Sequence, residues 1–230
     1  MTSRVFEIFS SVQGEGIYAG ERMVFVRFSG CNLNCDFCDT SHCRSAESGK
    51  VHSSAQIVEG IETELKASGN TSFVSFTGGE PLLHAEMISE IAPHFNKKGI
   101  KIYIDTNGTL YENFSKIESV VDYVAMDIKL PSSCGMEYWK EHLEFLKLAK
   151  KNVFVKIVIT ARTTRDEFER AVDIIAGVDL SIPLVIMPVT PIKCVESMPF
   201  EKIRALKKIA EKKLTNVSII PQMHKKLGIR

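Results

Sequence analysis

Three cysteines in the N-terminal part of the chain are close enough in sequence to bind one metal centre. They are Cys31, Cys35 and Cys38, in the sequence CNLNCDFC, and Cys43 follows them. Three thiols are an odd number for disulfide bonds and one ligand short of a closed tetrahedral metal site. The spacing therefore raises the question of what takes the fourth ligand position, for which Cys43 is the nearest thiol.

Two kinds of metal centre are compatible with this spacing. Short spacers let three thiolates hold a [4Fe–4S] cluster by three corners, which leaves one iron open to an external chelate. A structural zinc site usually has two pairs of ligands, and only His42 and Cys43 are near enough to form the second pair. The cluster is the favoured interpretation, because the missing ligand then marks a binding position. Cys43, Cys134 and Cys194 are expected to be thiols outside the cluster.

The elements that position these cysteines alternate between strands and helices. Runs rich in β-branched and aromatic residues predict strands at 5–9, 23–28, 72–77, 100–105, 123–128, 153–159, 183–187 and 216–220. Apolar residues at helical spacing predict helices around 57–65, 87–95, 143–148, 165–176 and 203–210, with a weaker candidate after 106–108. Capping-box sequences at Ser53–Gln56 and Thr164–Glu167 mark two helix starts.

Strands separated by helices at this rhythm predict an α/β fold with a mostly parallel sheet. There are about six such units, fewer than the eight of a complete barrel. We therefore predict an incomplete (β/α)6-type barrel, a partial TIM barrel, within a single domain over residues 1–230. Residues 1–22 would form an N-terminal extension, 23–220 the partial barrel and 221–230 a C-terminal tail.

Polar and glycine-rich sequences follow five of the predicted strands directly. They are SGCNLNCDFCDT after 23–28, TGGEP after 72–77, DTNG after 100–105, DIK after 123–128 and MPVTP after 183–187. The carboxyl ends of parallel strands share one rim, where the chemistry of α/β folds collects. The five sequences are therefore expected to form one site.

The composition favours a small-molecule substrate over a nucleic acid. Lys and Arg number 29 against 28 Asp and Glu, so the chain lacks the basic excess of most nucleic-acid-binding proteins. No stretch is apolar enough for a membrane span or a signal peptide. We expect a cytoplasmic protein without a membrane partner, in which the thiols stay reduced.

The sequence Gly78-Gly79-Glu80-Pro81 has two interpretations. Two glycines let a ligand approach the backbone closely, and carbonyls at a strand end can accept from an ammonium group. The alternative is a simple turn before a helix, with Pro81 at its first position. The neighbouring cysteine motif favours the ligand-binding interpretation.

Together, CNLNCDFC after the first barrel strand and GGEP after the second resemble the radical S-adenosylmethionine (SAM) superfamily. The resemblance implies that SAM binds the open iron of a [4Fe–4S] cluster held by Cys31, Cys35 and Cys38. Reductive cleavage of SAM would then give a 5′-deoxyadenosyl radical. The SAM-binding positions implied by the resemblance are Phe37, Asp39, Gly78, Gly79, Glu80, Asp127, Lys129, Pro188 and Val189.

Sequences near the two ends of the chain narrow the resemblance. QGEG at 13–16 alone reads as a glycine turn, and QMHKKLGIR at 222–230 alone reads as a basic tail. With GCNLNCDFCDT and TGGEP they resemble the 7-carboxy-7-deazaguanine synthase (QueE) family. This resemblance implies a lyase that converts 6-carboxy-5,6,7,8-tetrahydropterin to 7-carboxy-7-deazaguanine with loss of ammonia, in queuosine or archaeosine biosynthesis. SAM would be regenerated in each turnover.

The same resemblance implies substrate and Mg²⁺ ligands. The pterin would contact Val12, Gln13, Gly14, Glu15, Arg27, Thr77, His224 and the C-terminal Arg230, with residues 221–230 folded over the active site. Mg²⁺ prefers oxygen ligands, and Thr40 is implied as one of them. The alternative for Thr40 is a capping hydroxyl.

Two other functions remain open from the sequence. An activating enzyme for a glycyl-radical or ribonucleotide-reductase partner would share the cluster and GGEP, but it acts on a protein and does not need QGEG. A non-catalytic iron–sulfur or zinc protein would transfer electrons or act as a scaffold. The synthase interpretation implies a flavodoxin- or ferredoxin-type electron donor and a homodimer.

Overall fold

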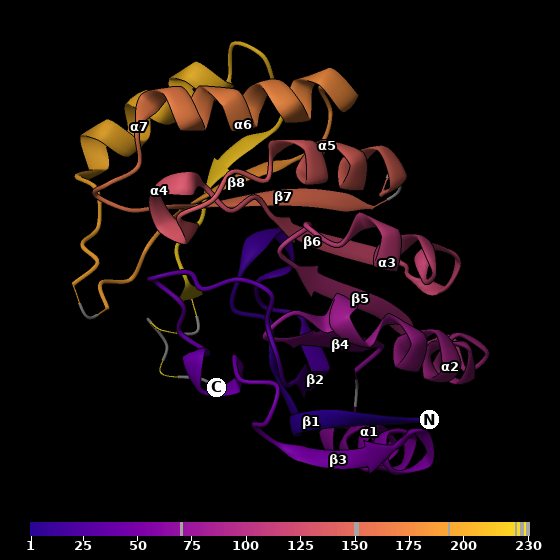
Figure 1. The fold of residues 1–230 in the computed structure, drawn as a ribbon. Helices are drawn as coiled ribbons and strands as arrows, with labels where there is room; N and C mark the ends of the chain where they lie inside the picture. Colours follow the sequence, from indigo (N-terminus) through magenta and orange to yellow (C-terminus); the bar gives the residue numbers. More distant parts are fainter. Residues whose placement is uncertain (70, 150–151, 193, 224, 226–227, 229–230) are drawn as a thin grey trace.

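The computed structural model describes the whole chain except residues 70, 150–151, 193, 224, 226–227 and 229–230. The strands are β1 (Thr2–Val12), β2 (Arg22–Phe28), β3 (Lys50–Ser53), β4 (Phe73–Gly78), β5 (Lys101–Thr106), β6 (Tyr123–Asp127), β7 (Val153–Ile159), β8 (Leu184–Pro188) and β9 (Val217–Ile219). In the described part of the chain they form one sheet, in the order β3-β1-β2-β4-β5-β6-β7-β8-β9 (Figure 1). The sheet therefore has two edges, β3 and β9, and is not a closed barrel.

Seven of these strands run parallel to one another, from β2 through β4, β5, β6, β7 and β8 to β9. This arrangement confirms the predicted incomplete barrel. The N-terminal extension joins the same sheet, because β1 pairs antiparallel with both β2 and β3. The short strand β3 was not expected from the sequence. Its half-exposed residues, KVHS, carry little of the apolar signal that marks a strand.

Helices connect the strands and cover the outer face of the curved sheet (Figure 1). They are α1 (Ser54–Ser68), α2 (Ala85–Asn96), α3 (Tyr111–Ser115), α4 (Pro131–Cys134), α5 (Trp139–Leu148), α6 (Arg165–Val178) and α7 (Phe200–Ala210). Both predicted capping boxes are present, at Ser53 with Gln56 and at Thr164 with Glu167. The weaker helix candidate after 106–108 is the short helix α3.

The two faces of the sheet bury different residues, as β7 illustrates. Val155 and Ile157 belong to the large core between sheet and helices, whereas Phe154, Lys156 and Val158 point to the inner face. Every residue of this strand is buried. Lys156 therefore points to the inner face and has an apolar side chain on each side of it along the strand.

Aromatic rings fill the inner face toward the amino ends of the strands. The ring of Tyr18 lies edge-on to Tyr103 and Tyr123, with centroids 5.8 and 5.2 Å away, and is 5.9 Å from Phe154. Gly16 precedes this tyrosine at a φ of +69°, and a Cβ there would overlap the Phe154 ring. We call the four rings of Tyr18, Tyr103, Tyr123 and Phe154 the aromatic plug. The cavity described below is lined by residues from the carboxyl ends of the strands.

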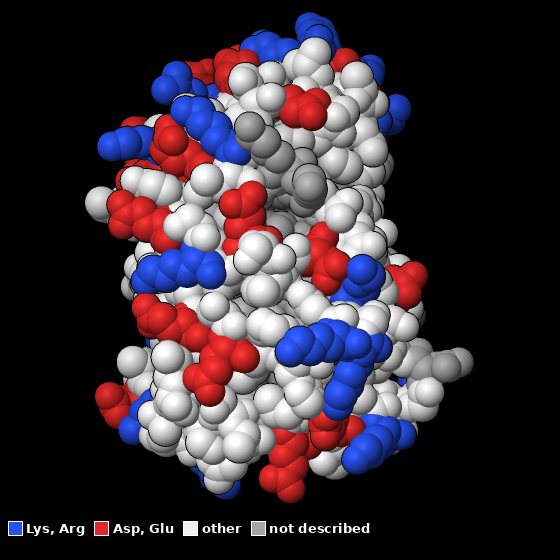
Figure 2. All heavy atoms as spheres, turned by 90° about the vertical axis from the view of Figure 1, so that its right-hand side faces the viewer, with Lys and Arg blue, Asp and Glu red and all other residues white. Residues whose placement is uncertain are grey.

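The described surface shows mixed charge. On the face turned toward the viewer in Figure 2, basic and acidic side chains are interspersed rather than gathered by sign. Among the residues that the structure describes, none of the helices has the length and apolar character that crossing a bilayer requires.

Candidate active site

The carboxyl ends of the parallel strands open into one cavity above the aromatic plug. Most of the predicted site residues line it: Val12, Gln13, Gly14, Glu15, Arg27, Cys31, Cys35, Phe37, Cys38, Asp39, Thr40, Thr77, Gly78, Gly79, Asp127 and Lys129. They come from the loop after β1, from β2 and the loop that follows it, and from the ends of β4 and β6. The expectation that these strand-end sequences share one rim is therefore correct for these segments.

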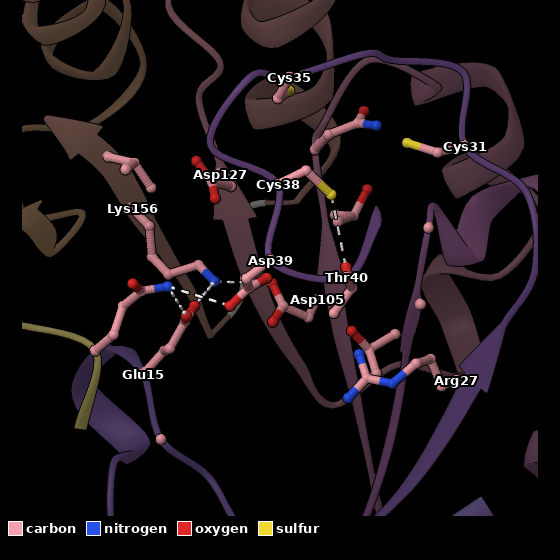
Figure 3. A pocket seen from close by; sticks show the side chains of 18 of the residues that line it. Glu15, Arg27, Cys31, Cys35, Cys38, Asp39, Thr40, Asp105, Asp127 and Lys156 are labelled. Atoms are coloured by element: carbon pink, nitrogen blue, oxygen red, sulfur yellow. Dashed lines mark hydrogen bonds and ion pairs between the residues drawn. The ribbon is translucent and has the colours of Figure 1, made fainter. Parts of the chain in front are cut away.

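The loop that carries the three cysteines is fixed at its base and at its middle. At the base, Gly30 N donates to Cys43 O at 2.9 Å and Cys31 N donates to Arg44 O at 3.0 Å. In the middle, Arg44 Nη2 donates to Cys35 O at 2.9 Å. These bonds hold the loop so that all three thiols line the cavity, as Figure 3 shows.

Gly78 and Gly79 let the end of β4 lie close to the end of β2 and the start of the cysteine loop. Gly78 has a φ of +134°, and a Cβ on it would overlap the carbonyl oxygen of Phe28. A Cβ on Gly79 would overlap the carbonyl oxygen of Gly30, to which Glu80 N donates at 2.8 Å. The backbone that approaches Gly78 is thus the end of β2, and the backbone that approaches Gly79 is the start of the cysteine loop, a reason that the sequence interpretation did not include.

The other side of the cavity carries a charged group that the sequence analysis missed in part. Lys156 Nζ donates to Glu15 Oε2 at 2.7 Å and to Asp105 Oδ1 at 3.0 Å. Gln222 Nε2, from the C-terminal segment, donates to Glu15 Oε1 at 3.0 Å and lies 3.5 Å from Asp39 Oδ2. In Figure 3 Lys156 and Glu15 lie on the left of the view and Asp105 near its centre, with Cys35 toward the top and Cys31 at the upper right. A single charged residue inside the run VFVKIVI was the available signal for Lys156.

Comparison with known proteins identifies the family. The model of the radical SAM superfamily matches residues 25–175. The 7-carboxy-7-deazaguanine synthase of Geobacter sulfurreducens is 36% identical, over 96% of each chain. The enzyme of the same name from Methanothermobacter thermautotrophicus is 32% identical, over 100% of this chain and 99% of its own. The chain belongs to the 7-carboxy-7-deazaguanine synthase family.

The fold agrees with this assignment. A crystal structure of QueE from Escherichia coli superposes with a TM-score of 0.65 at 19% identity, over 95% of this chain and 94% of that one. A structure of TYW1 with a lysine–pyruvate adduct superposes with a TM-score of 0.60 at 16% identity, over 84% and 74%. Membership in this family makes the chain a radical SAM lyase of 7-deazapurine biosynthesis that uses an iron–sulfur cluster, SAM and a reductant. Family membership decides against the two alternative functions, an activating enzyme and a non-catalytic iron–sulfur or zinc protein.

The three loop thiols fit a [4Fe–4S] cluster. All six cysteines of the chain are free thiols, and burial raises the pKa of Cys31 and, to about 11, that of Cys35. Metal binding supplies the positive charge that buried thiolates need. Within the described part of the chain, no three His, Cys, Asp or Glu side chains meet at the spacing of a single ion. Thiols arranged around a cavity suit a larger group.

Cys43 is not part of this arrangement. Its side chain is fully buried, and Sγ donates to Thr40 O at 3.0 Å rather than lining the cavity. The ring of His42 lies against Phe6, with centroids 4.7 Å apart. The second ligand pair that a structural zinc site would need is therefore not assembled from these two residues. Cys134 ends α4, and Cys194 lies in an exposed turn rather than beside a helix.

Two buried polar atoms on the cavity wall fit a synthase that holds SAM and a small molecule there. Asp127 Oδ2 accepts from Lys129 Nζ at 2.7 Å, but Asp127 Oδ1 has no partner among the described residues, and neither does Gln13 Nε2. Buried polar groups are rarely left unpaired in native proteins. Lys129 Nζ also lies 5.0 Å from the ring centroid of Phe37. Asp127, Lys129 and Phe37 thus form one surface beside the cysteines.

Several predicted site residues lie elsewhere. Pro188 and Val189 line a neighbouring hollow at the end of β8, together with Phe200 and Pro221, and not the cavity of the cysteines. Val189 packs in an apolar cluster with Val158 and so lies behind the cavity wall. Pro188 and Val189 therefore do not line the cavity of the cysteines in this structure, and their contact with SAM stays a prediction. His224 and Arg230 lie outside the described residues.

Glu80 also lies outside the cavity lining. Its Oε1 accepts from Thr106 Oγ1 at 2.7 Å and from Leu82 N at 3.0 Å, and its Oε2 accepts from Asn107 N at 2.8 Å. The fully buried carboxyl group therefore joins the end of β4 to the end of β5. These three hydrogen bonds account for the buried position of the Glu80 side chain, and a contact of Glu80 with SAM stays a prediction.

Replacing Glu80 with glutamine is expected to change how stability depends on pH. Burial raises the pKa of Glu80 from 4.5 to about 7, although the three hydrogen bonds oppose the shift. The folded state therefore keeps a proton that the unfolded state loses above pH 4.5, and the free energy of unfolding falls as the pH rises toward 7. The glutamine variant lacks this component. Urea unfolding of both proteins across the range measures it, with the exposed Glu112→Gln as control. Identical pH profiles for wild type and Glu80→Gln would contradict the assignment.

Proposed function

We propose that the chain converts 6-carboxy-5,6,7,8-tetrahydropterin to 7-carboxy-7-deazaguanine, with loss of ammonia. The observation that supports this most is that one cavity is lined both by the three cysteines and by the QGEG loop, residues 13–15 in particular. A radical SAM activating enzyme has no use for that loop. The proteins of the same name that match nearly the whole chain support the same substrate and product.

Cys31, Cys35 and Cys38 would hold the cluster, and Gly79, Asp127 and Lys129 lie where SAM would reach it. When bound, the cluster and SAM supply a 5′-deoxyadenosyl radical that takes a hydrogen atom from the substrate. The chain's own residues bind these groups and shield part of the site from water. Cys35 is 8% exposed and Asp127 7% exposed, so these two side chains are shielded from bulk water, whereas Cys31 and Cys38 are half-buried.

The substrate would bind between Arg27 and the charged group around Glu15. Arg27 Nε donates to Glu7 Oε1 at 2.8 Å, and its guanidinium carbon lies 5.5 Å from the ring centroid of Phe9. These contacts fix the plane of the guanidinium while it lines the cavity, an arrangement suited to a carboxylate. Gln13 and Glu15 would bind the amide and amine edge of the pterin.

Mg²⁺ belongs to this proposal through Thr40. The Thr40 hydroxyl lines the cavity and makes no helix-capping hydrogen bond, so the capping alternative is not realised in this structure. The hydroxyl oxygen lies 3.8 Å from Cys38 Sγ. A hydroxyl in this position can serve as one oxygen ligand, with the substrate carboxylate and waters completing the shell. A homodimer and a flavodoxin- or ferredoxin-type donor are proposed from the family alone.

An anaerobic assay of the reconstituted protein tests the function. With SAM, Mg²⁺, a reductant and the carboxytetrahydropterin, we expect formation of 7-carboxy-7-deazaguanine, with many product molecules formed for each SAM consumed. Product identity is read by mass spectrometry and ultraviolet absorption. Reductive cleavage of SAM to 5′-deoxyadenosine without conversion of the pterin would show a radical SAM enzyme with another substrate.

A further inference from the structure

We propose that Lys156 is a positioning residue for the substrate. Its ammonium group holds the carboxylates of Glu15 and Asp105 together on the cavity wall, and these form one acceptor surface for the donor-rich amide and amine edge of the pterin. The inference rests on the function proposed above and names the residue that organises substrate recognition.

Lys156 is enclosed by the fold. It lies at the middle of β7, between the inward-facing Phe154 and Val158, and its side chain is 3% exposed. A buried ammonium group is costly unless it is paired and hydrogen-bonded. Phe154, in the aromatic plug, lies on one side of it along the strand. The lysine therefore stands on the floor of the cavity, where the plug ends.

The two carboxylates that pair with Lys156 come from distant parts of the sequence. Glu15 lies in the loop after β1, and Asp105 lies near the end of β5. The ammonium group is 2.7 Å from an oxygen of the first and 3.0 Å from an oxygen of the second. Since both residues line the cavity, one buried cation fixes the positions of two acceptors that no backbone pairing joins directly.

Glu15 is held from a second side by Gln222. The amide of Gln222 donates to Glu15 Oε1 at 3.0 Å while Lys156 donates to Oε2. The neighbouring Met223 N donates to Gly14 O at 2.8 Å. The carboxylate plane of Glu15 is thus set by two donors. Asp105 is held at one oxygen, and its Oδ2 has no hydrogen-bond partner among the described residues.

The directions of the pKa shifts of Glu15, Asp105 and Lys156 support the proposal. Burial alone would raise the pKa of Glu15, but Lys156 lowers it overall. Burial raises the pKa of Asp105 despite the same lysine, and Asp127 and Glu15 add to the effect. The carboxylates of Asp105, Glu15 and Asp127 raise the pKa of Lys156 against the effect of burial. Lys156 therefore stays charged, and without it Glu15 and Asp105 would repel each other.

Ionised carboxylates only accept hydrogen bonds, and two of them side by side match adjacent N–H groups on a ring edge. The pterin presents such an edge at its ring N–H and exocyclic amine. Two carboxylates with one ammonium leave a net charge of about −1 on this wall, which attracts donors without requiring a cationic ligand. The role of Lys156 is to assemble this surface before the substrate arrives.

Lys156→Met tests the proposal by separating pterin binding from SAM chemistry. Equilibrium binding of 6-carboxypterin, an unreactive oxidised analogue, is measured on the reconstituted protein with Mg²⁺ by quenching of pterin fluorescence. We expect its affinity to fall at least about tenfold, because the two carboxylates separate or take up a proton. Cluster content and the rate of SAM cleavage without pterin should stay within about twofold of the wild type, since neither depends on this pairing.

Lys101→Met is the matched control. Its ammonium group also pairs with a carboxylate, Asp122 Oδ1 at 2.9 Å, but at the exposed start of β5. It should bind the pterin like the wild type. Unchanged pterin affinity in Lys156→Met would overturn the proposal. A wild-type protein that cleaves SAM but neither binds nor converts the pterin would instead contradict the proposed function.

A double variant covers the case in which Lys156→Met does not fold. Lys156→Met with Asp105→Asn restores the wild-type net charge of the group and removes the repulsion. We expect the thermal stability to return while the pterin affinity stays low, because Glu15 still lacks its anchor. Recovery of wild-type affinity in the double variant would show that Lys156 only neutralises charge, and the positioning role would be wrong.

Discussion

Replacing Cys35 with alanine is expected to abolish the [4Fe–4S] cluster and all SAM cleavage. The side chain is 8% exposed and lines the cavity beside Cys31 and Cys38. Two remaining thiolates cannot hold three corners of a cluster. Iron and sulfide content after anaerobic reconstitution, together with the visible absorption of the cluster, measure the effect. Assays for 5′-deoxyadenosine should show only background.

Cys43→Ala is the matched control, because it removes another buried thiol from the same loop. The variant loses the hydrogen bond from Sγ to Thr40 O, which is 3.0 Å long, and leaves a small void. We expect a loss of about 1–2 kcal/mol in the free energy of unfolding and a cluster content like that of the wild type. Loss of the cluster in Cys43→Ala would contradict the three-thiol assignment and return Cys43 to the ligand set.

Replacing Gly79 with alanine is expected to destabilise the protein severely. The new methyl group would overlap the carbonyl oxygen of Gly30 and press on the Cβ of Cys31. Since the overlapping oxygen is backbone, the cysteine loop must move away from the end of β4. The expected loss is about 3 kcal/mol or more in the free energy of unfolding, and cluster loading should fall with it. Chemical unfolding and iron content measure the two effects.

Gly177→Ala is the comparison for this change. Gly177 lies in α6, and a Cβ there would meet no atom within 4 Å beyond its chain neighbours and the backbone of its own helix. Alanine should stabilise the helix by about 0.5–1 kcal/mol. If Gly79→Ala kept wild-type stability and cluster content and lost only SAM affinity, the close approach at this glycine would be that of the ligand, as the sequence alone suggests, and not that of the loop.

Much of the fold could be predicted because its signals are local. Runs such as VFVKIVI have the β-branched residues of buried strands, and the capping boxes at Ser53 and Thr164 mark helix starts through nearby hydrogen bonds. The parallel order then follows from the alternation of strands and helices. The shared rim of the site could be predicted from this order, because the carboxyl ends of parallel strands lie at the same edge of the sheet. β3 was missed because an edge strand of half-exposed residues needs little apolar patterning.

The site could be predicted only where residues are close in sequence or carry a family motif. The group of Glu15, Asp105 and Lys156 is formed by contacts between residues 51 and 141 positions apart, so spacing reveals nothing of it. Glu80 stands inside a recognisable motif, yet its carboxylate turns to Thr106 and Asn107. A motif identifies the residue types that a family needs, but which of them face the cavity depends on packing.

The aromatic plug has a consequence for the traffic of molecules. Because Tyr18 and its neighbours close the interior at the amino ends of the strands, the cavity has its opening at the loop end. Gln222 and Met223 lie at that end, bonded to the QGEG loop. The pterin and the departing product then share one opening. Because Gln222 and Met223 lie beside it, we expect substitutions at these two residues to change the rates of pterin entry and product release.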